Sequence, residues 1–143
     1  MLIRTPTVQS NYLASVMRAI AAFQMIEEGL KICIGLSHQV LEQVAPSPIT
    51  FKVDATKINE APLGKLIELF SQVSTNEQLI KDLKKVRPWR NFCAHNAFSH
   101  EFLNTHGESG FDDRKESELK LVVERCQNIL ERIGAEIKLV QHE

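Results

Sequence analysis

Between Ser10 and Val44, apolar residues recur at steps of three and four, and this spacing constrains the fold more than any other feature. Such steps return a side chain to the same face of an α-helix, because each residue turns by about 100°. We therefore predict one long amphipathic helix, which Gly29 and Gly35 weaken and where they mark a bend. Its apolar stripe consists of Leu13, Val16, Met17, Ile20, Phe23, Ile26, Leu30, Cys33, Ile34, Val40, Leu41 and Val44.

A stripe of this length has to be buried, since an isolated helix gains most of its stability from packing. Two partners are open at this point, the core of the same chain or a second copy, and we favour the core. After Pro46 and Pro48, residues 45–59 are predicted to be a connection over the bundle, with a short extended piece at Ile49–Val53.

Three further amphipathic segments follow along the chain. A short helix is expected from about Asn59 to Val73, and the next begins at the capping box Ser74-Thr75-Asn76-Glu77. Pro88 should kink or interrupt this helix, leaving Trp89 to about Phe98 as a separate piece. After a loop at residues 104–110, a capping box at 113–116 starts a last helix that runs almost to the C-terminus.

The composition fits one soluble domain. A chain of 143 residues with 43% hydrophobic and 24% charged residues can bury a core of its own. Cys33, Cys93 and Cys126 are odd in number and lack CxxC spacing, which is typical of a reduced, cytoplasmic protein. We find no signal peptide and no apolar run of the roughly 18 residues that span a membrane. The sequence thus predicts one all-α domain over 1–143, a four- to five-helix bundle with long N- and C-terminal helices.

Positive charge is concentrated in one short segment, residues 81–90. Residues 81–90 hold three Lys and two Arg against one Asp, although the whole chain has a net charge of −1. This segment can attract an anionic backbone, and its tryptophan can stack on a base. The alternative is a solvated helix face with the tryptophan in the core. The candidate RNA-binding residues are Lys81, Lys84, Lys85, Arg87 and Trp89.

Arg90, Asn91 and His95 are the candidate catalytic residues. An imidazole can act as acid or base near neutral pH, and a guanidinium offers paired donors to a phosphate. Asn91 and His95 are four residues apart and share a helix face. Arg90 and His95 are five apart, about 140° around the axis, so one straight helix does not bring them together. Either the helix is distorted near Pro88, or the two side chains come from two copies.

The run Arg90-Asn91-Phe92-Cys93-Ala94-His95 resembles the Arg-x4–6-His signature of HEPN domains, in which a polar residue, often Asn, follows the Arg. The resemblance implies a small all-α bundle, commonly a two-fold dimer, and a metal-independent endoribonuclease of toxin–antitoxin or phage-defence type. In such enzymes the 2′-hydroxyl of the RNA is the nucleophile and a cyclic phosphate is formed. Toxins that pair with a nucleotidyltransferase antitoxin often carry a Tyr two residues after the His, where this chain has Ala97.

The predicted function is therefore RNA cleavage by a homodimer, with RNA as substrate, an antitoxin or other protein as a further partner, and no cofactor. The competing hypothesis is a catalytically silent helical module that binds a protein or a nucleotide through the same surface. We predict no metal site, because His95, His100 and His106 do not have the three- or four-residue spacing that places ligands on one helix face.

Overall fold

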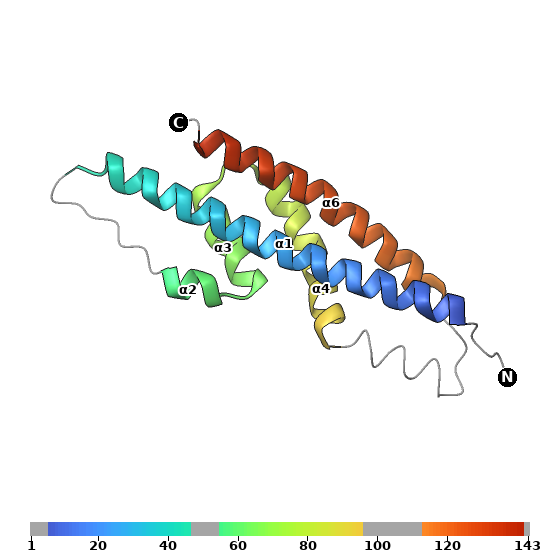
Figure 1. Cartoon of the computed structure of the whole chain (residues 1–143). Coiled ribbons are helices and arrows are strands. Elements are labelled where there is room, and N and C mark those ends of the chain that lie inside the picture. Colours follow the sequence, from blue (N-terminus) through green and yellow to red (C-terminus); the bar gives the residue numbers. More distant parts are fainter. Residues whose placement is uncertain (1–5, 47–54, 96–112, 142–143) are drawn as a thin grey trace. The chain divides into compact units, whose positions relative to one another are not determined.

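The computed structural model describes residues 6–46, 55–95 and 113–141, which form five α-helices and no strand (Figure 1). The predicted all-α bundle with long first and last helices is confirmed. None of the described helices combines the length and the apolar character that crossing a bilayer requires. The helices are α1 (Pro6–Val44), α2 (Ala55–Glu60), α3 (Leu63–Val73), α4 (Glu77–His95) and α6 (Asp113–Gln141).

The described residues group into two compact units, each of which combines distant parts of the chain. Unit 1 takes residues 6–24, 86–95 and 113–128, and unit 2 takes 25–46, 55–85 and 129–141. Since α1, α4 and α6 each contribute to both units, neither unit is one continuous piece of sequence. A single domain over the whole chain stays a prediction.

Apolar side chains from three helices form the core of unit 1, and the aromatic rings of Tyr12 and Phe23 are its largest members. Unit 2 has its own core, to which all five helices contribute. The buried residues of unit 1 include Tyr12, Val16, Ala19, Ala22, Phe23, Val86, Cys93, Leu119, Val122 and Cys126. Those of unit 2 are Ile26, Leu30, Cys33, Ile34, Ile58, Leu63, Leu66, Ile67, Phe70, Leu79, Leu83, Ile129 and Ile133.

Helix α1 is longer than predicted and is broken at neither glycine. It begins at Pro6, whose fixed φ suits the first helical position. Gly29 has a packing role instead, because a Cβ placed there would lie only 2.8 Å from Cγ2 of Ile133 on α6. The glycine thus lets α1 and α6 approach each other closely within unit 2.

The predicted stripe of α1 is confirmed as core at its central positions but not at its edges. Val16, Phe23, Ile26, Leu30, Cys33 and Ile34 are buried. Met17 is 60% exposed, because it lies one residue, or about 100°, beyond Val16. Leu41 and Val44, in the last turns of the helix, are exposed as well. The alternative that this stripe forms a dimer face is therefore wrong for its central part.

The last part of the expected connection is helical, and two helices stand where one short helix was expected. Residues 55–59 were expected to belong to a connection, yet they lie in α2, where Ile58 is buried. Pro62 separates α2 from α3: it has no N–H to donate, and with an extended backbone it serves as the N-cap of α3. The extended piece expected at Ile49–Val53 lies outside the described residues, as does the loop at 104–110.

Helix α4 begins two to three residues later than the capping box predicts. Ser74 is the C-cap of α3, and its backbone N–H donates to the carbonyl of Phe70. Asn76 is the residue that caps α4, since its carbonyl accepts the N–H of Ile80 and its side-chain oxygen accepts the N–H of Leu79. The start of α6 at Asp113 agrees with the second predicted box.

Pro88 does not interrupt α4, so the prediction of a separate piece after it was wrong. A proline inside a helix leaves the carbonyl four residues earlier without its usual donor. That carbonyl belongs to Lys84, which is exposed, so water can replace the donor. Val86 and Cys93, on either side of Pro88, are both buried in the core of unit 1. The expected extension to Phe98 lies outside the described residues.

Candidate functional site on α4

The second half of α4 carries all three candidate catalytic residues. Asn91 and His95 are exposed, and His95 is the last residue of the helix. Arg90 is half-buried. The predicted outward orientation of the basic residues is confirmed: Lys81, Lys84, Lys85 and Arg87 are all exposed.

Helix register explains why Arg90 and His95 differ in exposure. Arg90 is one turn from two buried residues, four after Val86 and three before Cys93, so it lies at the edge of the buried side. His95 follows Cys93 by two residues, which places it about 160° away on the opposite side. Arg90 and His95 both follow Pro88 in one uninterrupted helix, so the angle of about 140° between them is kept. Asn91, one turn before His95, does share its face.

Trp89 is half-buried and is engaged by side chains of its own unit. Its ring meets that of Phe92 edge to face, with centroids 5.5 Å apart. The Lys115 ammonium of α6 lies 5.1 Å from the Trp89 ring centroid and 4.9 Å from that of Phe92. A cation over an aromatic face is attracted to the ring electrons. A nucleic-acid base that stacked on this face of Trp89 would have to displace Lys115. This face of the ring is therefore not open for stacking, although the sequence prediction had assumed that it is.

Lys115 is a neighbour of the motif that sequence reasoning missed. It is 26 residues from Trp89, and no spacing rule connects the two positions. Its ammonium also lies 3.8 Å from a carboxylate oxygen of Glu118, which reduces the positive charge that it contributes.

Two thiols lie on the buried side of this region. Cys93 and Cys126 are both free and buried. Burial raises the pKa of Cys93 to about 11. The pKa of Cys126 rises to about 12, first through burial and then through repulsion by Cys93. Both groups are protonated at neutral pH, and neither is a reactive nucleophile.

The first half of α4 is tied to α6 by polar bonds within unit 2. The Arg132 guanidinium donates to the Asp82 carboxylate at 2.6 Å, and this bond is the main cause that holds the pKa of Asp82 below its usual value, against the opposing effect of burial. Asn76 donates through Nδ2 to Glu136 at 2.9 Å. These contacts fix the register of α4 on α6 but lie in the part of α4 that lacks the motif.

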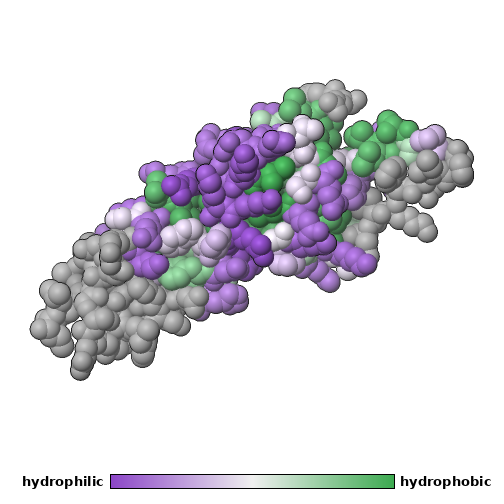
Figure 2. Space-filling view, turned by 180° about the vertical axis from the view of Figure 1, so that it is seen from behind, coloured by the Kyte–Doolittle hydropathy of each residue, from purple (hydrophilic) through white to green (hydrophobic). Residues whose placement is uncertain are grey.

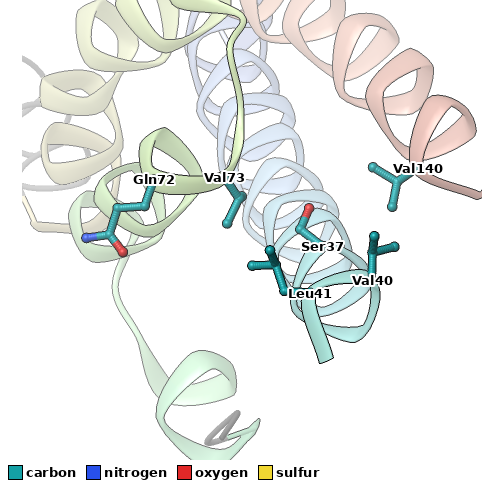
Figure 3. A pocket seen from close by; sticks show the side chains of 6 residues that line it. All are labelled: Ser37, Val40, Leu41, Gln72, Val73 and Val140. Carbon is teal, nitrogen blue, oxygen red and sulfur yellow. The ribbon is translucent and has the colours of Figure 1, made fainter. Parts of the chain in front are cut away.

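Unit 2 also contains two open pockets. A groove of about 280 Å³ lies among the last turns of α1, α3 and α6 (Figure 3). Its lining carries no charged side chain and consists of Ser37, Val40, Leu41, Gln72, Val73 and Val140. A second pocket, of about 300 Å³, lies between α1 and α2 and includes Lys31 and Glu42. Neither pocket contains a candidate catalytic residue.

The described surface is mostly hydrophilic on the face in Figure 2, where separate hydrophobic patches interrupt it. The large hydrophobic side chains that are exposed in the described part of the chain are Met17, Met25, Ile32, Leu41, Val44, Leu121 and Leu139. His100 and His106 lie outside the described residues. Within the described ranges, no group of three potential ligands among His, Cys, Asp and Glu gathers as a metal site would require.

Comparison with known proteins adds no relative: the chain matches no family model, no curated protein and no solved structure.

Proposed function

We propose that the protein is a cytoplasmic, metal-independent endoribonuclease of HEPN type that acts as a homodimer. The observation that carries the proposal is the exposure of Asn91 and His95, one turn apart at the end of α4. By helix register, Lys84 lies on nearly the same side, seven residues before Asn91. An acid–base group therefore ends a helix whose solvent side is basic, which is the chemistry that an RNA backbone requires.

In the proposed reaction the RNA supplies the nucleophile. A base removes the proton of the 2′-hydroxyl, the resulting oxygen attacks the adjacent phosphorus, and the bond from phosphorus to the 5′-oxygen breaks. An acid returns a proton to that 5′-oxygen, leaving a 2′,3′-cyclic phosphate and a 5′-hydroxyl. His95 moves these protons, and Arg90 stabilises the additional negative charge on the phosphate.

Each site in this proposal combines Arg90 of one copy with His95 of the other. The reason is the angle of about 140° between the two positions on one uninterrupted helix. The further proposal of a toxin or defence role, with an antitoxin as protein partner, rests on the HEPN resemblance alone.

The test is an RNA cleavage assay in EDTA. We expect wild-type cleavage, and a loss of about 10²–10⁴-fold for His95→Ala. Arg90→Ala should be strongly impaired, and Arg90→Lys should retain part of the activity because it keeps the charge but not the paired donors. His38→Ala and Arg125→Ala, at positions outside the motif, are the matched controls and should cleave like wild type.

Mixing inactive Arg90→Ala and His95→Ala chains tests the composite site. Half of the randomly paired dimers would be mixed, each with one intact site of two, so about a quarter of the wild-type activity should return. Thermal melting of every variant separates lost chemistry from lost folding. If His95→Ala cleaves RNA normally but melts at a much lower temperature, His95 is a packing residue and the nuclease proposal falls.

A protein-binding module is the second candidate, and the groove in Figure 3 favours it. Leu41, Val44 and Leu139 are exposed on the last turns of α1 and α6, and exposed apolar residues at a groove are typical of contact surfaces. Absence of RNA cleavage in the wild-type protein would favour this function over the first.

A further inference from the structure

A lysine lies in the apolar stripe of α6 within unit 1. The buried residues of α6 in this unit are Leu119, Val122 and Cys126. Lys115 precedes Leu119 by four residues, about one helix turn, and so lies on the same side of α6. Its side chain is only 32% exposed. Taking an ammonium out of water costs free energy, so a lysine at this position needs groups that compensate its charge.

Two aromatic rings of α4 provide this compensation. The Lys115 ammonium lies 5.1 Å from the ring centroid of Trp89 and 4.9 Å from that of Phe92. Ring electrons attract a cation without neutralising it as a carboxylate does. The Glu118 carboxylate is 3.8 Å away, beyond the usual length of a hydrogen bond, and its side chain is 48% exposed, where ion pairs contribute little. The positive charge of Lys115 therefore stays available to a further anion.

The two rings lead along α4 to His95. Trp89, Phe92 and His95 follow one another at three-residue steps, and residues three apart are neighbours on a helix surface. Because Lys115 lies over the first two, its ammonium stands beside the surface on which His95 is exposed. All four residues belong to unit 1, so their placement does not depend on unit 2. Helix α6 thus supplies a cation near the His95 of its own chain.

We propose that Lys115 binds a phosphate of the RNA that is cleaved at His95, and that Trp89 and Phe92 hold its ammonium in place for this contact. The proposal adds a binding residue to the site of the proposed function, and it rests on that function for RNA as the ligand. Trp89 then acts on the RNA backbone through Lys115 and does not stack on a base. A phosphate contact carries no sequence information, so the effect of Lys115 is the same for every base sequence.

The rings also lower the entropic cost of this contact. A free lysine side chain loses much rotamer freedom when it is fixed on a ligand. The Lys115 ammonium already lies over two rings before RNA is bound, so less freedom remains to be lost. An ammonium has three donors, and the attraction to a ring depends on its charge. Lys115 can therefore donate to a phosphate while it stays over the rings.

The test measures binding separately from cleavage. The full chain is titrated in EDTA into a fluorescent single-stranded 2′-O-methyl RNA, which lacks the nucleophilic hydroxyl, and anisotropy gives Kd over a range of salt concentrations. Lys115→Gln should raise Kd by about fivefold at 0.1 M salt. It should also lower the slope of log affinity against log salt by about 0.7 for each Lys115 that the RNA contacts. Lys115→Arg keeps the charge and the ring contact and should restore both values.

A second ligand separates a phosphate contact from base stacking. An abasic oligonucleotide of the same length has phosphates but no bases. Lys115→Gln should weaken the binding of both ligands by the same factor, and a loss confined to the ligand with bases overturns the proposal. Phe92→Leu keeps every charge but removes one ring beneath Lys115, so it should raise Kd by about two- to fivefold with an unchanged salt slope. A wild-type Kd for Phe92→Leu would overturn the positioning role of the rings.

Lys120→Gln is the matched control, because it makes the same charge change on the same helix. Lys120 follows Lys115 by five residues, about 140° around the axis, and its ammonium lies 3.4 Å from Glu116. It should bind both ligands like wild type. Circular dichroism and thermal melting check the fold of each variant. If Lys115→Gln is unfolded at the assay temperature, Lys115→Met fills the apolar position in its place, with the same expected loss.

The two proposals fail separately. His95-dependent cleavage together with a wild-type Kd for Lys115→Gln would support the nuclease and overturn the phosphate contact. Binding that depends on Lys115, without any cleavage of RNA, would support the contact and overturn the nuclease. The phosphate contact is also overturned if the wild type binds neither ligand, if Lys115→Arg restores nothing, or if Lys120→Gln weakens binding as much as Lys115→Gln.

Discussion

Both halves of α4 bury apolar side chains, and the first half is in addition tied to α6 by polar bonds. Before Val86, polar side chains reach α6: Asp82 pairs with Arg132 and Asn76 with Glu136. From Val86 on, the contacts include the buried thiol of Cys93 and the Trp89–Phe92 pair beneath Lys115. The first half uses Asp82 and its N-cap Asn76 for structure, whereas the second half leaves Asn91 and His95 exposed.

This difference shows where a function can be placed on such a helix. A polar side chain that holds two helices together cannot also bind a substrate without a cost in stability. The exposed Asn91 and His95 lie where apolar and aromatic contacts hold the helix, so these two residues can change without unfolding the protein. The comparison leads to three predictions about how strongly each region is held.

The largest effect concerns thiol reactivity. Burial, with a contribution from Glu136, raises the pKa of Cys33 in unit 2 to about 11 from 9.0, and burial raises that of Cys93 in unit 1 equally. Only the thiolate reacts, so labelling by a disulfide reagent at pH 8 should be about a hundredfold slower than in urea-unfolded protein.

Cys93 should nevertheless react before Cys33, because it is two residues from the end of α4 and Cys33 is eleven from the end of α1. Helix ends open more readily than helix centres. Mass spectrometry of labelled peptides gives the order. If Cys33 is labelled first, the second half of α4 opens less readily than the centre of α1, contrary to this prediction.

Asp82→Asn should destabilise the protein by about 1.5–3 kcal/mol at pH 7, because it removes the charged acceptor of Arg132. The Arg132 Nε is buried and has no hydrogen-bond partner among the described residues, so the guanidinium depends on this carboxylate. Urea denaturation measures the loss. Glu68→Gln, in the exposed pair with Lys65, is the matched control and should change stability by under about 0.5 kcal/mol.

The sign of the pH dependence follows from the lowered Asp82 pKa. The folded protein keeps Asp82 ionised at a pH where the unfolded chain, with an ordinary value of 3.8, takes up a proton. The stabilisation is therefore complete well above pH 3.8 and is lost as the pH falls through the lower folded-state value. The difference in free energy of unfolding between wild type and Asp82→Asn should therefore become smaller in that pH range. A difference that grows on acidification would contradict a lowered Asp82 pKa in the folded protein.

Gly29→Ala should give the smallest change, a destabilisation of about 1 kcal/mol. The new Cβ would lie 2.8 Å from Ile133, so α1 and α6 would have to shift apart. The better helix propensity of Ala offsets part of this cost. Gly35→Ala is the control on the same helix, because its Cβ would meet nothing within 4 Å, and it should stabilise by about 0.5–1 kcal/mol. If urea denaturation shows the same change in free energy of unfolding for both variants, the close approach of α1 and α6 at Gly29 is excluded.

The sequence alone determined the features that depend on neighbouring residues. Apolar spacing predicted the long first and last helices and the buried centre of the α1 stripe, because a face repeats every three or four residues. The same spacing predicted that Lys81, Lys84, Lys85 and Arg87 are exposed. It also placed Arg90 and His95 on different sides of one helix, the fact on which the proposed composite site depends.

Tertiary structure decided the features that depend on residues far apart in the chain. Asn76 caps α4 while bonded to Glu136, sixty residues away, and no local box distinguishes it from Ser74. Pro88 stays inside α4 because Val86 and Cys93 are buried on both sides of it, which local propensity does not include. Likewise, Trp89 is covered by Lys115 from another helix. Propensity and periodicity act over a few residues, whereas burial and ion pairing depend on which helices meet.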